Sequence, residues 1–374
     1  MDTHELIDDW PACGRARLKR LDLLVATLCI AALTAGCSSG STRTGAGTTG
    51  SRTEAQTTTT TVVTRPNRPP VRPRGAFLVM VGGGAGASTG DIFLVNAGTG
   101  AIRLVAKGVE LGEEPRWSPD GRRILASAVR DGSTDVLSYP IRGGRAIDLT
   151  PTRSRWESQP RSSPDGMRVA FLSQRGDTSD NDVYVVPAVG GRPRLVVRHA
   201  DGLAWSPDSR FLAFAPGVEG PARVGLWLVS ASAGPPRPLG TGGSGDSIEW
   251  GPGRRILYTA SGAMIAHPTY LWTASGERQV GLVGYPQFLT GGTVGFLQTE
   301  HKLGFLRPSG SRVSAGLPDR ATSVAWSPDG RYLAFASAWT GKVYIARADG
   351  SGPRRLPVNF GSSQIEVFGW QPGS

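Results

Sequence analysis

Few residues in this chain have the types and spacing that catalysis or metal binding requires. The 374-residue sequence has four histidines and three cysteines, and it contains neither an HxxxH pair nor a CxxC pair. Zinc sites are usually built from such closely spaced ligands. The sequence therefore excludes a zinc site of the usual spacing. The histidines are His4, His199, His267 and His301.

A serine nucleophile is the second chemistry to consider. The pattern Gly-x-Ser-x-Gly, which in hydrolases sits on a strand-to-helix turn, occurs at 36–40 and at 86–90. The first copy runs into a polar tract, and the second lies in a glycine-rich loop between two expected strands. We therefore expect that Ser88 is not a nucleophile.

A short acidic segment offers oxygen ligands for calcium. It consists of Asp177, Asp180, Asn181 and Asp182. Calcium takes roughly six to eight oxygen ligands, more than this segment supplies. A hairpin turn is therefore the favoured interpretation and calcium the alternative, and no other cofactor is expected.

The elements that would position functional residues come from an internal repeat. Trp-Ser-Pro-Asp-Gly-Arg occurs at 117–122 and again at 326–331, and related segments start at 162, 205, 250, 288 and 370. Pro at the second position and Gly at the last favour a type I turn. Each copy therefore predicts a hairpin, and its Trp indicates packing between units, with a sugar-stacking surface as the alternative.

Each unit contains four short apolar segments that we expect to be strands. In one unit these are 169–173, 182–186, 194–197 and the segment that enters the next Trp at 205. Four-stranded units of about 40–45 residues are typical of a β-propeller. The sequence therefore predicts an all-β fold.

The ends of the repeat region predict the number of blades. Residues 76–81 form a post-turn strand without a Trp strand before it, and 364–370 form a Trp strand without a successor. The last segment would complete the first blade as its innermost strand, which gives a seven-bladed β-propeller. Six blades are the alternative, if the degenerate unit at 288 is absorbed elsewhere.

The Trp-Ser-Pro-Asp-Gly repeat resembles the TolB-like (WD-like) repeats of periplasmic TolB proteins and of the propellers in prolyl-oligopeptidase-type enzymes. The resemblance extends from residue 76 to the C-terminus. It implies the fold and leaves the function open, because such propellers serve as docking modules, carbohydrate-acting enzymes and peptidase lids.

The innermost strands of a propeller surround one channel, so equivalent positions on them are expected to meet. The residues four positions before the motif starts are Glu113, Ser158, Asp201, Asp246, Gly284, Thr322 and Glu366. Four of these seven are acidic, and Glu114 and Glu157 are adjacent to the same register. The acidic members of this register, with Glu157, are predicted to bind a ligand at one channel mouth. The alternative is that they are solvated strand starts.

The first 36 residues have the layout of an export signal. Basic residues precede an uncharged stretch at 23–35, which is too short for a membrane span of roughly 20 residues. The sequence Leu-Thr-Ala-Gly-Cys at 33–37 resembles the lipobox of bacterial lipoproteins, which implies lipidation of Cys37. A permanent transmembrane helix is the alternative.

A composition change divides the rest of the chain. Residues 37–74 are rich in Ser, Thr, Gly, Pro and Arg and are expected to be a flexible linker, followed by the propeller at 75–374. The formal charge is +11. Because arginine is spread over nearly every segment, nucleic-acid binding is not expected.

These observations predict a monomeric propeller that is lipid-anchored to the extracytoplasmic face of the cell membrane. We expect it to bind a protein, peptide or glycan of the cell envelope without catalysis. The alternative is a lyase or other glycan-processing enzyme that acts at the channel mouth.

Overall fold

The computed structural model describes residues 73–82, 87–111, 113–130, 132–151, 155–175, 181–217, 225–241, 247–259, 268–282, 284–337, 340–358, 360 and 364–373. The predicted signal, Cys37 and residues 37–72 of the predicted linker lie outside this part of the chain. No helix in the described ranges is long and apolar enough to cross a membrane.

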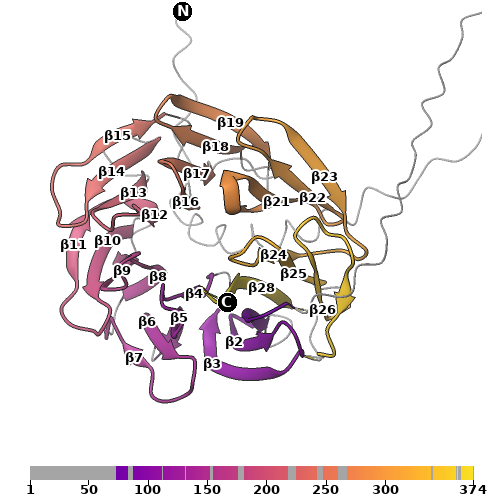
Figure 1. The fold of residues 1–374 in the computed structure, drawn as a ribbon. Coiled ribbons are helices and arrows are strands. Elements are labelled where there is room, and N and C mark those ends of the chain that lie inside the picture. The colour runs from indigo at the N-terminus through magenta and orange to yellow at the C-terminus, as the bar shows by residue number, and fades with distance from the viewer. Residues whose placement is uncertain are drawn as a thin grey trace, which may run out of the picture. The chain divides into compact units, whose positions relative to one another are not determined.

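The described strands form four four-stranded sheets and one 12-stranded sheet, in which two further strand pairings join three antiparallel sets of four. All of these sets surround a common axis (Figure 1). The first set runs from the axis outward as β28 (Ile365–Trp370), β1 (Ala76–Gly82), β2 (Thr89–Asn96) and β3 (Ile102–Glu110). The all-β propeller that the repeats predict is confirmed.

The remaining sets follow in chain order. They are β4 (Arg116–Trp117), β5 (Arg123–Arg130), β6 (Ser133–Pro140) and β7 (Ile147–Asp148); β8 (Arg155–Ser162), β9 (Arg168–Arg175), β10 (Asn181–Pro187) and β11 (Arg194–Val197); β12 (Ala200–Trp205), β13 (Phe211–Pro216), β14 (Leu226–Ser230) and β15 (Arg237–Gly240); β16 (Ile248–Gly251), β17 (Arg255–Thr259), β18 (Pro268–Thr273) and β19 (Gly276–Leu282); β20 (Gly284–Phe288), β21 (Val294–Thr299), β22 (Lys302–Leu306) and β23 (Arg312–Gly316); and β24 (Ser323–Trp326), β25 (Tyr332–Ser337), β26 (Lys342–Arg347) and β27 (Arg354–Arg355). A short 3-10 helix, η2 (Thr290–Gly292), replaces the Ser-Pro-Asp-Gly turn between β20 and β21.

The Ser-Pro-Asp-Gly segments form the predicted hairpin turns between the first two strands of a set. In the turn at 118–121, Gly121 N donates to Ser118 O at 2.9 Å, and Ser118 Oγ donates to Asp120 Oδ1 at 2.6 Å. Arg123 N donates to Ser118 Oγ at 2.9 Å as the next strand begins. The glycine has a φ of 64°, in the left-handed region that glycine tolerates best. The motif thus satisfies its own polar groups.

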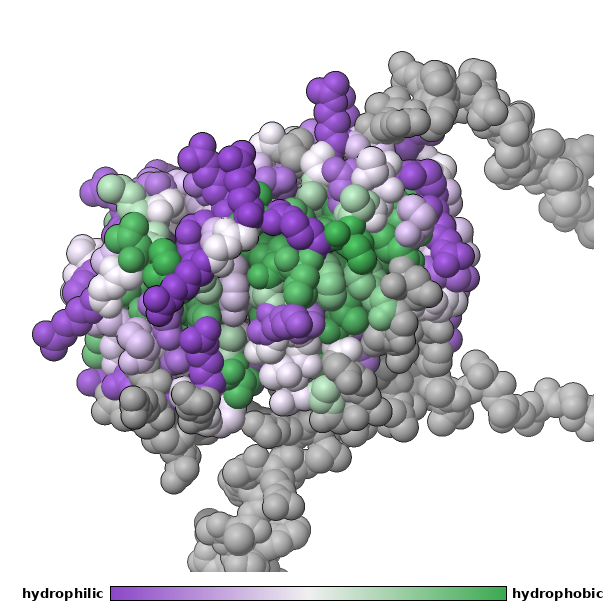
Figure 2. Space-filling view, turned by 90° about the horizontal axis from the view of Figure 1, so that it is seen from below, coloured by the Kyte–Doolittle hydropathy of each residue, from purple (hydrophilic) through white to green (hydrophobic). Residues whose placement is uncertain are grey.

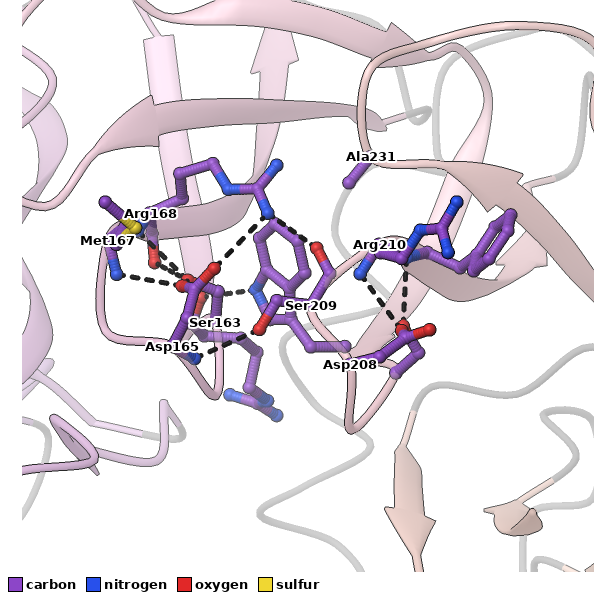
Figure 3. Close-up of polar contacts among 12 residues, drawn as sticks. Ser163, Asp165, Met167, Arg168, Asp208, Ser209, Arg210 and Ala231 are labelled. Atoms are coloured by element: carbon purple, nitrogen blue, oxygen red, sulfur yellow. Dashed lines mark hydrogen bonds and ion pairs between the residues drawn. The ribbon is translucent and has the colours of Figure 1, made fainter.

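Neighbouring turns are also bonded to each other across the blade interface (Figure 3). Asp165 N donates to Ser209 Oγ at 3.0 Å, and an Arg168 Nη donates to Ser209 O at 2.6 Å. The Arg168 guanidinium lies 5.0 Å from the centre of the Trp205 ring, and Trp205 Nε1 donates to Arg161 O at 2.9 Å. At this interface the repeated Trp therefore joins adjacent blades, as the packing interpretation predicts.

The two ends of the propeller meet in one sheet. Strand β28 pairs antiparallel with β1, with Phe77 opposite Trp370 and Met80 opposite Glu366. Gln371 N donates to Ala76 O at 2.8 Å just beyond the paired strands. The prediction that the last Trp segment completes the first blade is confirmed.

Removing residues 364–374 should abolish stable folding, because closure of the propeller by strand pairing depends on β28. The deletion takes away Ile365, Val367 and Trp370, which are 1%, 1% and 4% exposed. Burying each such side chain contributes about 1.5–3 kcal/mol, so the loss is comparable with a typical total stability of about 5–15 kcal/mol. Thermal melts followed by circular dichroism measure the effect. Removing 372–374 alone is the control, and a 364–374 deletion that melts within a few degrees of the full chain would contradict strand closure.

Candidate functional site

Charged side chains from separate blades approach each other at the propeller axis. Arg161 on β8 lies within electrostatic reach of Glu113, Glu114 and Arg116, which belong to the segment around β4. It is also influenced by Glu249 on β16. Glu366 on β28 is influenced in turn by Glu114. We call these six residues the axial cluster: Glu113, Glu114, Arg116, Arg161, Glu249 and Glu366.

The repeat explains why these residues meet. Arg116, Arg161 and Glu249 each stand directly before a motif start, at 117, 162 and 250. They therefore occupy the same position on three innermost strands. Once the ring is closed, equivalent positions on these strands face a common channel.

Hydrogen bonds between innermost strands hold the cluster in place. Glu113 Oε2 accepts from Gln159 N at 2.9 Å, and Glu249 Oε1 accepts from Phe288 N at 3.1 Å. Each bond joins a side chain of one blade to the backbone of the next. These two carboxylates consequently have a structural role in addition to any contact with a ligand.

The same pattern continues around the axis through neutral side chains. Gln287 Oε1 accepts from Trp326 N at 3.1 Å, and Ser323 Oγ accepts from Val367 N at 2.7 Å. A side-chain oxygen thus links consecutive innermost strands at several interfaces.

Burial determines the protonation of the cluster. Burial is the main cause that raises the pKa of Glu113 to about 7 and of Glu249 to about 7. Burial, and then Glu114, also raise the pKa of Glu366. Glu114 differs because its ion pair with Arg116 lowers its pKa. The cluster therefore holds carboxyl groups that titrate near neutral pH beside one that stays ionised.

Burial also acts on the cationic side of the cluster. It lowers the pKa of Arg161 to about 9, and the nearby Arg116 adds to this shift. Four carboxyl groups thus share the axis with two guanidinium groups. The axial cluster is therefore mixed in charge.

Only some of the residues predicted to line the channel belong to the axial cluster. Glu113 and Glu366 both belong to the axial cluster. Asp201 lies beside it, since Gln159 Nε2 donates to Asp201 O at 3.4 Å. Glu157 is only 2% exposed and lies opposite Ser173 on β9. Asp246 lies outside the described residues, and ligand binding by these side chains stays a prediction.

Sequence reasoning missed Arg116, Arg161 and Glu249. All three occupy the position directly before a motif start, so comparing that position across the repeats would have found them. The comparison four positions upstream selected acidic residues and passed over the cations that lie among them.

The acidic segment at 177–182, for which a hairpin turn is predicted and calcium binding is the alternative, is only partly described. Asp182 forms an ion pair with Arg198 at 3.2 Å, and its Oδ1 accepts from His199 N at 3.4 Å. Asp177 and Asp180 lie outside the described ranges. Where the structure is described, no three or more His, Cys, Asp or Glu side chains are grouped to hold a metal ion.

Glu249→Gln should make stability less dependent on pH. Folding raises the pKa of Glu249 from 4.5 to about 7, so the folded chain keeps a proton that the unfolded chain loses. The free energy of unfolding of the wild type therefore falls as the pH rises between these two pKa values, by about 3 kcal/mol at most. The variant keeps an oxygen for the Phe288 N–H. It should melt above wild type at alkaline pH and match it at acid pH, in melts recorded across this range.

Asp120→Asn supplies a control of opposite sign. In the wild type, the hydrogen bond from Ser118 lowers the pKa of Asp120 and so stabilises its ionised form. The Asp120→Asn variant should therefore lose stability at neutral pH and approach wild type as the pH falls. Parallel pH profiles for wild type and Glu249→Gln would contradict the burial of Glu249 at the axis.

Comparison with protein families finds one repeat of the WD type. The family model described as WD domain, G-beta repeat matches residues 315–345. Uncharacterized protein Atu1656 of Agrobacterium fabrum is 26% identical over 135 residues, which is 35% of this chain and 45% of that protein. The match thus spans less than half of this relative.

Solved structures give the same result for the fold. A functionally unknown protein from Desulfotomaculum acetoxidans has a TM-score of 0.53 at 13% identity, covering 78% of this chain and 99% of that one. Oligogalacturonate lyase from Vibrio parahaemolyticus has a TM-score of 0.51 at 10% identity, covering 74% and 90%. TolB from Acinetobacter baumannii has a TM-score of 0.49 at 16% identity, covering 79% of this chain and 66%, just under two thirds, of TolB. At the level of the fold, the chain is a β-propeller with a WD-type repeat at 315–345, as its repeats predict; the TM-score of 0.49 with TolB is too low to add to this conclusion.

Proposed function

We propose that this propeller is a non-enzymatic binding module, lipid-anchored at the extracytoplasmic face of the cell membrane. Its ligand is a protein, peptide or glycan of the cell envelope, held at the mouth of the axial channel. The observation that carries the proposal is the axial cluster, in which charged side chains from separate blades converge.

The composition of the cluster favours a ligand that presents positive charge. Four carboxyl groups outnumber two guanidinium groups, and desolvation holds back the ionisation of Glu113 and Glu249. A cationic group brought into the channel would stabilise the ionised carboxylates. Binding of a basic side chain would therefore be coupled to release of protons.

Sequence features that are typical of an exported lipoprotein support the same proposal. A lipobox-like segment ending at Cys37 and a linker rich in Ser, Thr and Pro precede the propeller. A lipid on Cys37 would hold the propeller at the membrane while the linker lets it reach envelope partners.

A glycan-processing enzyme is the second candidate. Carboxyl groups with a pKa near 7, such as those of Glu113 and Glu249, suit general acid–base catalysis. The fold likeness to oligogalacturonate lyase makes oligogalacturonate a reasonable first substrate to try. If the wild type cleaves oligogalacturonate, and if Glu113→Gln and Glu249→Gln each abolish formation of the product, the enzyme is favoured over a binding module.

Glu114→Gln combined with Glu366→Gln should weaken binding of a short arginine-containing peptide, measured by titration calorimetry. Hydrogen bonds to charged groups contribute about 1.5–3 kcal/mol, so we expect the affinity to fall about tenfold or more. Asp349→Asn, which changes an acidic residue in the turn between β26 and β27, should bind like wild type. No heat of binding to wild type, or equal affinity in all three proteins, would contradict a channel site for cations.

Cys37→Ala should prevent lipidation and cleavage of the leader, because the thiol is the group that accepts the lipid. Metabolic labelling with a radioactive fatty acid and fractionation of cells measure both effects. Cys29→Ala, within the leader, should leave label and cleavage intact. If the wild type carries no label and both it and Cys37→Ala remain uncut in the membrane fraction, the segment is a plain signal anchor.

A further inference from the structure

The outer strand of the first blade exposes apolar side chains at the rim. Ile102 and Leu104 on β3 are 47% and 41% exposed. Leu104 lies opposite Phe93 on β2, whose ring centre is 5.1 Å from that of Phe360. We call these four residues the rim strip. Figure 2 looks at the edge of the propeller on which β3 lies and shows hydrophobic side chains gathered there among hydrophilic ones.

This arrangement differs from the other outer surfaces. Among the described residues, Ile102 and Leu104 are the one pair of exposed large hydrophobic side chains that stand two positions apart on a single strand. Val313 on β23, another outer strand, is 40% exposed without such a neighbour. Contiguous exposed apolar surface marks an interaction site more often than a single residue does.

Cationic side chains flank the rim strip. Arg103 and Lys107 are exposed on β3 itself. Arg354 comes from the adjacent blade, where one Nη donates to Ala97 O at 3.0 Å and to Gly98 O at 3.2 Å. Cationic residues therefore border the apolar ones on both sides.

The acidic residues of this region lie toward one end of β3. Asp91 is half-buried, and its Oδ1 accepts from Gly108 N at 3.3 Å. Glu110 is the last residue of the strand. The stretch from Ile102 to Lys107 contains no carboxylate. A basic border around apolar side chains is the composition that binds anionic membrane interfaces.

The N-terminal segment joins the propeller beside this strip. Gly75 O accepts from Ala97 N at 3.0 Å, so the chain enters the first blade at the turn between β2 and β3. Pro73 is buried there, and its carbonyl lies against Gly98. The 72 residues that contain Cys37 therefore lead directly to the end of the rim strip.

We propose that the rim strip is a membrane-contact edge that lies on a bilayer containing anionic phospholipid. Ile102 and Leu104 enter the boundary between headgroups and acyl chains, while Arg103, Lys107 and Arg354 face the lipid phosphates. The inference rests on the membrane location proposed above. Contact through the rim places the propeller axis along the membrane plane, which leaves the channel mouths open to a ligand.

An environment-sensitive fluorophore at Leu104 tests the contact directly. The full chain carries Cys13→Ser, Cys29→Ser and Cys37→Ala, so that Leu104→Cys is the single labelled thiol, and Val313→Cys is the matched control. We expect the uncut leader to hold both labelled proteins to vesicles, so that the position of the dye and not overall binding is compared.

Vesicles with phosphatidylglycerol should raise the emission of the dye at 104 severalfold and shift it to shorter wavelength. The dye at 313 should not respond, and phosphatidylcholine vesicles should give a weaker response at 104. Adding Arg103→Glu and Lys107→Glu should remove the response at 104.

Equal responses at 104 and 313, or none at 104, would overturn the membrane-contact edge. A response at 104 that grows with protein concentration without vesicles would show self-association through the strip and overturn it as well. Failure of Cys37 lipidation in cells would remove the proposed anchor and leave this measurement unchanged, so the two proposals fail separately.

Discussion

The pairing of β28 with β1 is the contact on which the rest of the propeller depends. It joins Trp370 to Phe77, residues from opposite ends of the repeat region. The same strand contacts both neighbouring blades: Val367 N donates to Ser323 Oγ at 2.7 Å on one side, and Trp117 Nε1 donates to Gly369 O at 2.7 Å on the other. Closure therefore brings equivalent positions of the innermost strands to one axis.

Closure has an electrostatic cost at that axis. Carboxyl groups that would ionise fully in water are gathered where burial raises the pKa of Glu113 and Glu249 to about 7. Arg116 and Arg161 offset part of this cost, and the backbone N–H groups of Gln159 and Phe288 offset more. A group of strongly shifted pKa values is typical of a functional site. The axial cluster is thus both an inter-blade connection and the place where we expect a ligand.

Much of the fold could be predicted because the repeats carry local turn chemistry. Pro, Asp and Gly fix the hairpins at 118–121, 163–166 and 327–330, so the strands on either side of these turns followed directly from the sequence. Two details did not follow. Trp326 Nε1 donates to Ala348 O, within its own blade, unlike the inter-blade bonds of Trp117 and Trp205. The unit at 288 replaces its turn with η2.

The candidate site was predicted only in part, and the backbone explains why. The pairing of β8 with β9 shifts between Ser158 and Arg161, and Gln159 has a φ of 50°. Counting four residues back from the motif therefore does not reach equivalent places on every blade. The cluster also depends on electrostatic interactions between residues far apart in the sequence, such as Arg161 and Glu249. A pattern within one repeat contains no information about interactions between different repeats.

Carbon-13 NMR titration of the side-chain carboxyl groups of Glu113 and Glu249 tests the central claim most directly. If the innermost strands gather these residues at a shared axis, both should titrate with a pKa of about 7. Replacing Arg161 by Gln should raise both values further, because a nearby positive charge is lost. Titration of both groups near the ordinary value of 4.5, unchanged by Arg161→Gln, would show that the carboxylates are separately solvated and that no axial cluster exists.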